Sequence, residues 1–229
     1  MPVISLLSPK GGVGKSTASL ILATELAHAG KAVSLVDADP NHPLVEWAKL
    51  PGVPANLTVI ADKSEETIVD TIEDAREKTP FVIVDLEGTA SARVTFAAAT
   101  SDLVLIPLQG SALDANQAVR AIKLLRSTGR TNRRDIPFAM LFTRMPAAMV
   151  SKNFRSIEGQ LVAGSIPVLP VWLYEREAFK SIFSRGGTLH TLDRGAVSNI
   201  KAAQENAAAY LWAVVHALKG AKSPEAAYA

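Results

Sequence analysis

The chain has 229 residues, 48% of them hydrophobic and 20% charged, which fits a single folded domain and excludes an intrinsically disordered protein. It contains no cysteine, and this excludes disulfides, thiolate zinc sites and iron–sulfur clusters. The formal net charge is only +2, so binding to nucleic acid would require a local basic patch. The apolar N-terminus lacks a basic leader, and no apolar run approaches the roughly 20 residues of a membrane span. We therefore expect a cytoplasmic protein with no membrane partner.

Short aliphatic runs alternate along the chain with longer amphipathic segments. The continuous apolar runs are typical of strands that are buried on both faces of a parallel sheet. The expected strands are Val3–Leu7, Ala32–Asp37, Leu57–Ala61, Phe81–Asp85, Leu103–Pro107, Phe138–Thr143 and Val168–Val171. The expected helices lie near Lys15–Ala29, Ser64–Lys78, Asp114–Ser127, Lys152–Val162, Glu175–Phe183 and Ser198–Leu218.

This alternation predicts an α/β fold with a mostly parallel twisted sheet and helices on both faces. We expect one domain over residues 1–219 and a flexible tail over residues 220–229. Several prolines between Pro40 and Pro54 indicate an irregular segment after the second strand, and Arg130–Asp135 is expected to be a polar loop.

A glycine-rich segment joins the first strand to the first helix, with the sequence Lys10-Gly11-Gly12-Val13-Gly14-Lys15-Ser16-Thr17. Glycines let backbone N–H groups approach phosphate oxygens closely, and the helix N-terminus favours an anion. Lys15 is expected to contact the β- and γ-phosphates, and the Ser16 hydroxyl to bind Mg²⁺. The segment therefore predicts a P-loop that holds ATP and magnesium. Pro9 stands where the general pattern has a glycine, and a second lysine, Lys10, lies inside the loop.

Three aspartates follow expected strands, at the sheet edge where open α/β folds bind ligands. Asp85 ends the apolar run Phe81–Val84, which has the form of a Walker B strand, and we expect it to hold Mg²⁺ through water. Asp37 and Asp39 follow the second strand, and either could orient the attacking water. We favour Asp39 for the water and Asp37 for Mg²⁺ or its shell. The alternative is that such aspartates only cap helices or turns.

The loop Lys10–Thr17 resembles the deviant Walker A motif of the ParA/MinD ATPases, in particular the small ParA/ParF-type partition ATPases. The resemblance covers most of the chain and includes Ser8-Pro9-Lys10, Asp37-Ala38-Asp39-Pro40, Ser101–Pro107 with Ser111–Asp114, Thr143-Arg144 and Phe179–Phe183. Two departures are Glu87, which adds charge near the phosphates, and Gln109-Gly110, which replaces a proline-containing stretch. Self-assembly properties linked to that stretch are therefore not carried over.

The resemblance implies that ATP is bound between two subunits of a homodimer and that Lys10 reaches the partner's phosphates. It also implies that Lys10, Lys15 and Asp39 serve a slow hydrolysis of ATP to ADP and phosphate. Thr143 and Arg144 occupy positions where this family often recognises the base, although a solvent-exposed loop arginine is an equally good interpretation. The ATP dimer would bind double-stranded DNA without sequence preference and associate with the nucleoid. A small centromere-binding or cargo-adaptor protein would stimulate hydrolysis.

Basic residues are frequent on the third expected helix, Asp114–Ser127, in the loop after it and toward the C-terminus. For any one of them a solvated helix face is the simpler interpretation, but as a group they favour phosphate contacts with DNA. The predicted DNA-binding residues are Arg130, Arg133, Arg134, Arg155, Lys180 and Arg185.

Two other functions use the same scaffold. A metabolic ATP-dependent ligase or synthase would need extra catalytic groups, and the sequence offers no such constellation. A MinD-like membrane-surface regulator would need a basic amphipathic C-terminal helix, which the residues after Leu218 do not provide. The cargo stays open among a plasmid, a chromosome, a protein compartment and a transfer complex.

Overall fold

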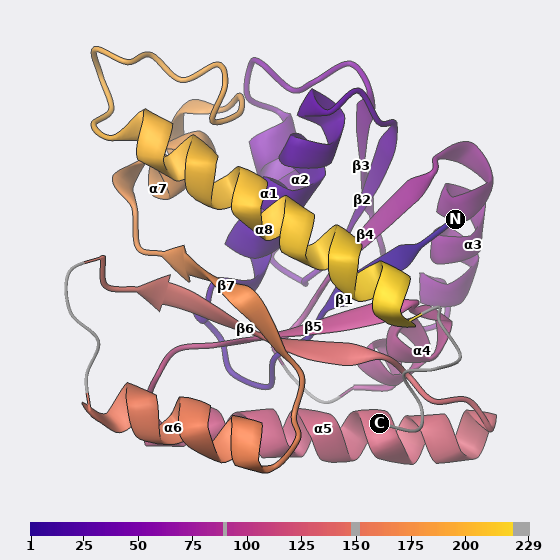
Figure 1. Ribbon diagram of the computed structural model, residues 1–229. Coiled ribbons are helices and arrows are strands. Elements are labelled where there is room, and N and C mark those ends of the chain that lie inside the picture. The colour runs from indigo at the N-terminus through magenta and orange to yellow at the C-terminus, as the bar shows by residue number, and fades with distance from the viewer. Residues whose placement is uncertain (89–90, 148–151, 222–229) are drawn as a thin grey trace.

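Seven parallel strands form one twisted sheet in residues 1–88, 91–147 and 152–221, the part of the chain that this computed structural model describes (Figure 1). The strands are β1 Val3–Leu6, β2 Val33–Ala38, β3 Leu57–Ala61, β4 Phe81–Leu86, β5 Leu103–Leu108, β6 Phe138–Met145 and β7 Val168–Tyr174. Their order across the sheet is β3-β2-β4-β1-β5-β6-β7, and each neighbouring pair is parallel. The predicted parallel α/β fold is confirmed.

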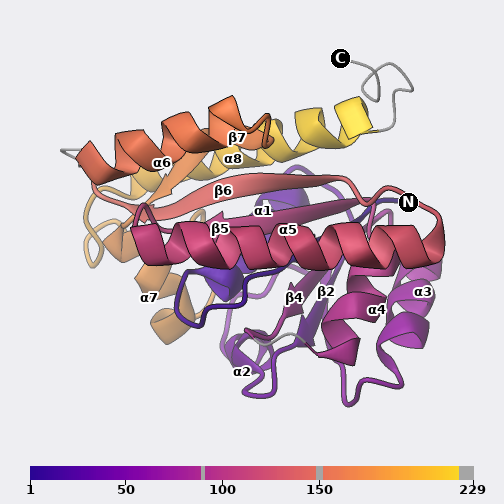
Figure 2. The ribbon, with the colours of Figure 1, turned by 90° about the horizontal axis from the view of Figure 1, so that it is seen from below.

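Helices cover both faces of this sheet (Figure 2). One face is packed against α1 Lys15–His28, α2 Pro43–Ala48, α7 Glu177–Arg185 and α8 Ile200–Ala221. The other face is packed against α3 Ile68–Lys78, α4 Ala92–Thr100, α5 Ala112–Asn132 and α6 Lys152–Ala163. Successive strand residues supply the two cores in turn: Ile83 enters the first core, while Val82 and Val84 enter the second.

The central strand β1 places the phosphate loop at the middle of the sheet. β1 lies between β4 and β5, and the carboxyl ends of these parallel strands share one edge. In the neighbouring pair of β2 and β4, Asp37 is directly opposite Asp85. The topology therefore gathers the predicted phosphate loop and the predicted strand-end aspartates at one edge.

Two short helices were not expected from the sequence. Pro43 begins α2, since proline fits the first helical position, where its missing N–H is not needed. Ser91 precedes α4, and its hydroxyl accepts a hydrogen bond from the backbone N–H of Val94 at 3.4 Å.

Several boundaries also differ from expectation, such as the start of α3 at Ile68 instead of Ser64. α5 continues to Asn132, so the expected loop at Arg130–Asp135 is partly helical. β7 continues to Tyr174 instead of ending at Val171. α8 continues to Ala221, so the first two residues of the expected tail are helical, and residues 222–229 lie outside the described part.

Among the residues described, no helix is both long enough and apolar enough to cross a membrane.

Candidate active site

The phosphate loop connects β1 to α1 through two glycines in the left-handed backbone region. Gly12 has φ of 74° and Gly14 has φ of 94°, a conformation that L-residues with a side chain rarely adopt. Gly14 directly precedes α1, and a Cβ atom built there would lie 3.6 Å from the Cβ of Thr143. The glycines thus meet a backbone requirement of the loop.

Lys15 is the first residue of α1, and only 6% of its surface is exposed. Burial lowers the pKa of its ammonium group, while the nearby carboxylates of Asp85, Asp39 and Glu87 act in the opposite direction. The predicted phosphate-binding lysine therefore lies in a partly desolvated position close to the acidic residues of the site.

Asp85 is completely buried at the end of β4. Its Oδ1 accepts a hydrogen bond from the Ser19 hydroxyl at 3.0 Å, and the Ser16 hydroxyl lies close to the carboxylate. Burial raises the pKa of Asp85 to about 7, and these hydroxyl groups counteract the rise. Within the described part of the chain, its Oδ2 has no hydrogen-bond partner. A buried carboxylate oxygen without a partner and an adjacent hydroxyl fit Mg²⁺, which prefers oxygen ligands, so Asp85 and Ser16 are the residues that would hold it.

Asp37 caps the start of α2, a contact that the sequence did not reveal. Its Oδ2 accepts hydrogen bonds from the backbone N–H groups of Leu44 at 2.8 Å and Val45 at 3.0 Å, at the start of α2. Its Oδ1 accepts one from the Asp39 N–H at 3.3 Å. Burial raises the pKa of Asp37, and the backbone donors oppose that shift. Its role at Mg²⁺ stays a prediction beside this role as a helix cap.

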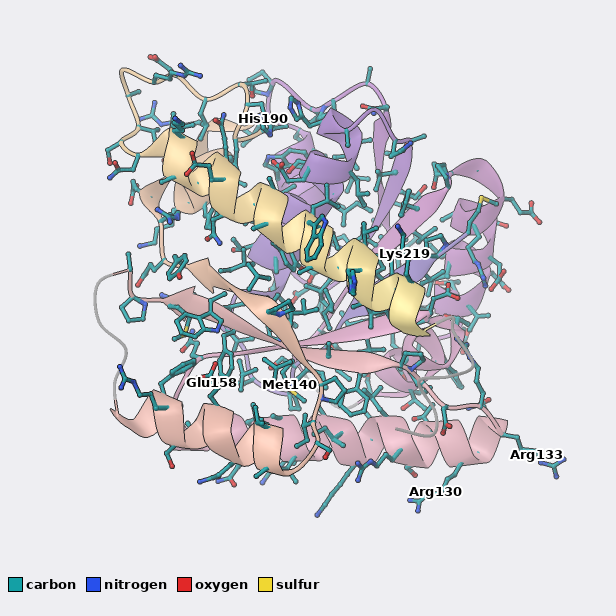
Figure 3. All side chains as sticks on the ribbon, viewed as in Figure 1. Arg130, Arg133, Met140, Glu158, His190 and Lys219 are labelled. Carbon is teal, nitrogen blue, oxygen red and sulfur yellow. The ribbon has the colours of Figure 1, made fainter. Side chains whose placement is uncertain are left out.

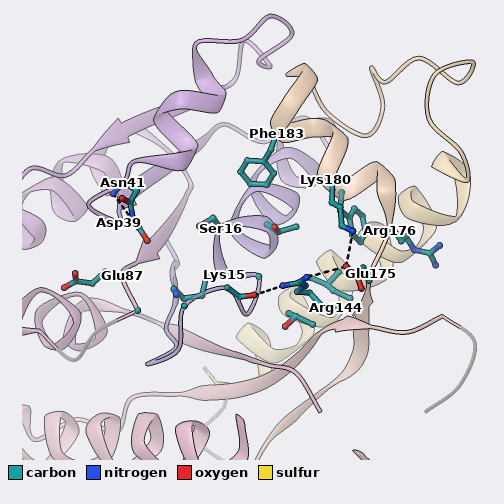
Figure 4. Close-up of a pocket in the computed structure, with 18 of the residues that line it drawn as sticks. Lys15, Ser16, Asp39, Asn41, Glu87, Arg144, Glu175, Arg176, Lys180 and Phe183 are labelled. Atoms are coloured by element: carbon teal, nitrogen blue, oxygen red, sulfur yellow. Dashed lines mark hydrogen bonds and ion pairs between the residues drawn. The ribbon is translucent and has the colours of Figure 1, made fainter. Parts of the chain in front are cut away.

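Asp39 lines the cavity in front of the phosphate loop (Figure 4). Its Oδ1 accepts hydrogen bonds from the backbone N–H of Asn41 at 2.9 Å and from its side-chain amide at 3.0 Å. Glu87 and Gly88 line the same cavity on the segment after β4. The aspartate predicted to orient water is thus held at one oxygen and borders the expected position of the nucleotide.

Thr143 and Arg144, at the end of β6, contact the phosphate loop directly. The Thr143 hydroxyl donates to the Val13 carbonyl at 2.6 Å, and the Arg144 guanidinium donates to the Gly12 carbonyl at 3.0 Å. Their predicted role in base recognition stays a prediction, but Arg144 does not simply extend into solvent: it lines the cavity and also pairs with Glu175 at 3.4 Å.

A wall of this cavity comes from β7 and α7, which the sequence analysis did not assign to the site. The cavity has a volume of about 780 Å³, and this wall is formed by Leu173, Tyr174, Glu175, Arg176, Phe179, Lys180 and Phe183. Glu175 pairs with Lys180 at 3.0 Å, and that hydrogen-bonded ammonium lowers the pKa of Glu175. The sequence signal for this wall was the segment Phe179–Phe183, which is part of the resemblance to the ParA/MinD ATPases.

Lys10 is not among the residues that line the cavity. It is half-buried, and its backbone N–H donates to the Ser8 hydroxyl at 3.3 Å. The remaining loop residues Gly11, Gly12, Gly14, Lys15, Ser16 and Thr17 line the cavity, whereas the Val13 side chain is buried.

The predicted DNA-binding residues do not form one patch. Arg130 and Arg133 are exposed at the end of α5 and point away from the body (Figure 3). Arg134 instead donates to the carbonyls of Ala99 at 2.9 Å and Ser101 at 2.6 Å, so its guanidinium is engaged within the chain. Arg155 is exposed on α6, Arg185 is exposed at the end of α7 on the opposite face of the sheet, and Lys180 borders the cavity.

Comparisons with known proteins agree with this geometry. The family model described as VirC1 protein matches residues 1–217. The chain is 39% identical over 214 residues to Protein ParA of Rhizobium radiobacter, which covers 93% of this chain and 96% of that protein. It is 26% identical over 191 residues to Maintenance of carboxysome distribution protein A of Halothiobacillus neapolitanus, with 82% and 87% covered. The solved structure of the MinD cell division protein of Aquifex aeolicus has a TM-score of 0.71 at 20% identity, with 94% and 97% covered.

The resemblance inferred from the loop is therefore confirmed, and the fold and site define a P-loop ATPase of the ParA/MinD superfamily. Within that superfamily, the chain belongs to the VirC1 protein family.

Proposed function

We propose that this protein is an ATP-dependent partition or cargo-positioning ATPase whose ATP-bound homodimer binds DNA. The observation that carries the proposal is the phosphate loop with two lysines: Lys15 lines the cavity, while Lys10 lies outside its lining. The similarity to Protein ParA and to the carboxysome distribution protein supports a partition or positioning role.

In the proposed reaction, Lys15 binds the β- and γ-phosphates of ATP, and Ser16 and Asp85 hold Mg²⁺. Asp39 orients the water that attacks the γ-phosphate, and its place in the cavity wall supports this role. Magnesium supplies charge neutralisation at the phosphates when it is bound. Slow turnover then sets how long the protein stays in its ATP-bound state.

Lys10 is the proposed contact with the partner subunit. Two nucleotides that face each other across an interface repel, and a lysine from each subunit would offset that charge. A charge-assisted contact contributes roughly 1.5–3 kcal/mol, about one to two factors of ten in affinity. ATP binding and dimerisation are coupled in this proposal, because the contact requires the triphosphate.

Exposed cations on α5 support a DNA-binding face. Arg120, Lys123, Arg126 and Arg130 are exposed on α5 at spacings of three and four residues, which brings them onto one side of the helix. Lysine and arginine in such a row bind phosphates without reading bases. We propose that this row, together with Arg133, holds the dimer on nonspecific double-stranded DNA and so on the nucleoid. A small centromere-binding or cargo-adaptor protein is the proposed stimulator of hydrolysis.

The test is Lys10→Ala, measured by sedimentation with a slowly hydrolysed ATP analogue and by calorimetry. The variant should keep nearly normal ATP affinity as a monomer but lose ATP-dependent dimerisation and DNA binding together. Lys15→Ala is the matched comparison, because it should lose ATP binding itself. A Lys10→Ala protein that dimerises normally would contradict the proposal and favour a metabolic enzyme on the same fold.

A further inference from the structure

A buried arginine at the start of α4 reaches across to the end of β2. The Arg93 side chain is 11% exposed, and its Nη1 donates a hydrogen bond to the carbonyl oxygen of Ala38 at 2.8 Å. Its Nε lies 3.3 Å from Oδ2 of Asp62, whose side chain is fully buried. Burying two charges costs several kcal/mol of desolvation per ion, so such a pair does not by itself account for stability. Because Arg93 binds the carbonyl of Ala38, the residue before Asp39, the pair can instead serve to hold the backbone at Asp39 in place.

Asp62 is anchored through its Oδ1 and its backbone, whereas its Oδ2 faces Arg93 as an ion pair without a hydrogen bond in the described part of the chain. Its Oδ1 accepts hydrogen bonds from the hydroxyls of Thr67 at 2.9 Å and Thr71 at 3.1 Å, at the start of α3. Its backbone N–H donates to the Asp37 carbonyl at 3.0 Å. The carboxylate that faces Arg93 is therefore anchored to both α3 and β2, and its charge lies beside the guanidinium.

The peptide group that joins Ala38 to Asp39 is fixed at both of its polar ends. Arg93 binds its carbonyl oxygen, and the Asp37 carboxylate accepts a hydrogen bond from its N–H at 3.3 Å. This peptide plane sets the direction in which the Asp39 side chain leaves the backbone. Rotation of the plane would move the Asp39 carboxylate away from its place in the cavity wall.

The helix that carries Arg93 follows, in the sequence, a segment that borders the site. Glu87 and Gly88 line the cavity, and a Cβ atom built on Gly88 would lie 3.4 Å from the backbone nitrogen of Gly11 in the phosphate loop. α4 begins at Ala92, shortly after that segment. One guanidinium thus ties the start of α4 to the strand end that carries Asp39.

We propose that Arg93 is a positioning residue for ATP hydrolysis: paired with Asp62, it holds the peptide that orients Asp39 toward the attacking water. The inference rests on the proposed function, in which Asp39 orients that water. Arg93 does not line the cavity, so its loss should affect turnover far more than nucleotide binding.

The first test is Arg93→Gln, with thermal unfolding, calorimetric affinity for a slowly hydrolysed ATP analogue and steady-state ATPase kinetics measured together. A misplacement of about 1 Å costs on the order of 100-fold in rate, so we expect kcat to fall about 10- to 100-fold while analogue affinity changes less than about threefold. Arg93→Lys should recover part of kcat, because an ammonium keeps the charge near Asp62 but lacks the fork that reaches two partners. Arg76→Gln removes another partly buried arginine pair, on α3, and should leave kcat unchanged.

Asp62→Asn is the second route to the same result, and it serves if Arg93→Gln does not fold. It should lower kcat in the same way, because the guanidinium loses its ionic partner. In an Asp39→Asn background, Arg93→Gln should lower kcat little further, since both changes disrupt the same orientation of the attacking water.

The proposal is overturned if Arg93→Gln keeps wild-type kcat, if analogue affinity falls as much as kcat, or if Arg76→Gln loses the same turnover. An Asp39→Asn protein with full turnover would instead overturn the role that the proposed function gives to Asp39.

Discussion

At the scale of single residues, the site contains two carboxylates that are costly to bury as charged groups. Asp85 and Asp37 are fully buried, and Asp85 leaves one oxygen without a hydrogen bond among the described residues. Such groups destabilise the ligand-free protein, because burial favours their neutral forms. A functional site of this kind is expected to lower stability when it is empty.

Asp85→Asn should therefore stabilise the ligand-free protein. Burial raises the folded-state pKa of Asp85 to about 7, above its unfolded value, so folding favours the protonated form. The stability lost by deprotonation grows as the pH rises from the unfolded value through about 7, and a neutral amide avoids that loss.

Thermal unfolding in EDTA at about pH 8 should show a higher Tm for this variant, by about 2–4 °C for each kcal/mol in a chain of this size. The difference should shrink toward about pH 5. Magnesium-dependent hydrolysis should be lost in the same variant. Asp39→Asn is the control, because that carboxylate is less buried and should give no comparable gain. Equal Tm values at the higher pH would contradict the argument.

At the scale of elements, α2 is a short helix that depends on a strand-end carboxylate. Asp37 accepts two backbone hydrogen bonds at the start of α2, and Asp39, Pro40 and Asn41 border the cavity. The Asp37 carboxylate therefore connects the stability of this helix to the structure of the site. It also offers a way to separate the two roles of Asp37.

Asp37→Asn should keep the cap, because an amide oxygen can still accept the N–H groups of Leu44 and Val45, and asparagine caps helices about as well as aspartate. Asp37→Ala removes the cap and should cost about 0.5–2 kcal/mol of unfolding free energy. Urea unfolding and magnesium-dependent ATPase activity would be measured on both. If Asp37 also serves Mg²⁺, the asparagine variant should be stable yet require more magnesium. If it needs no more than wild type, Asp37 acts only as a cap.

Much of the element pattern follows from the sequence, because continuous apolar runs such as Phe81–Val84 suit only doubly covered strands. α2 was missed because closely spaced prolines favour an irregular segment, although Pro43 in fact begins a helix. The phosphate loop was found because its glycine and lysine spacing is specific. The wall from β7 and α7 and the Arg93–Asp62 pair depend on long-range packing, which no local pattern records.

At the scale of the whole molecule, the basic residues and the nucleotide site occupy different parts of the surface. The cationic row lies on α5, which packs on the face of the sheet opposite α1 and α7 (Figure 2). In the proposed function, coupling between ATP and DNA would pass through the dimer, because the proposed row does not line the cavity. The proposed DNA-binding face can therefore be altered without changing a residue that lines the cavity.

Replacement of Arg126, Arg130 and Arg133 by glutamine should weaken DNA binding in ATP while leaving ATP affinity unchanged. For every DNA phosphate that is no longer neutralised, the slope of log affinity against log salt should fall by about 0.9. Fluorescence anisotropy with unrelated duplexes at several salt concentrations would measure this. The matched control removes the same charge from three exposed lysines elsewhere, Lys31, Lys49 and Lys201. An equally weakened affinity in both variants would indicate a net-charge effect, and an unchanged affinity in the arginine variant would place the DNA face elsewhere.

The strand order has a consequence for how the chain is made. β1 is synthesised well before its two neighbours in the sheet, β4 and β5, which pair with it through Val82 and Leu103. At about 5–20 residues per second, a ribosome needs roughly 5–20 s to synthesise the chain from β1 through β5, the later of its two neighbours. Until then an apolar strand and its phosphate loop have no sheet to join, and such late, long-range pairing folds slowly and exposes the chain to aggregation. The phosphate loop is thus synthesised long before the two strands that flank β1 in the sheet.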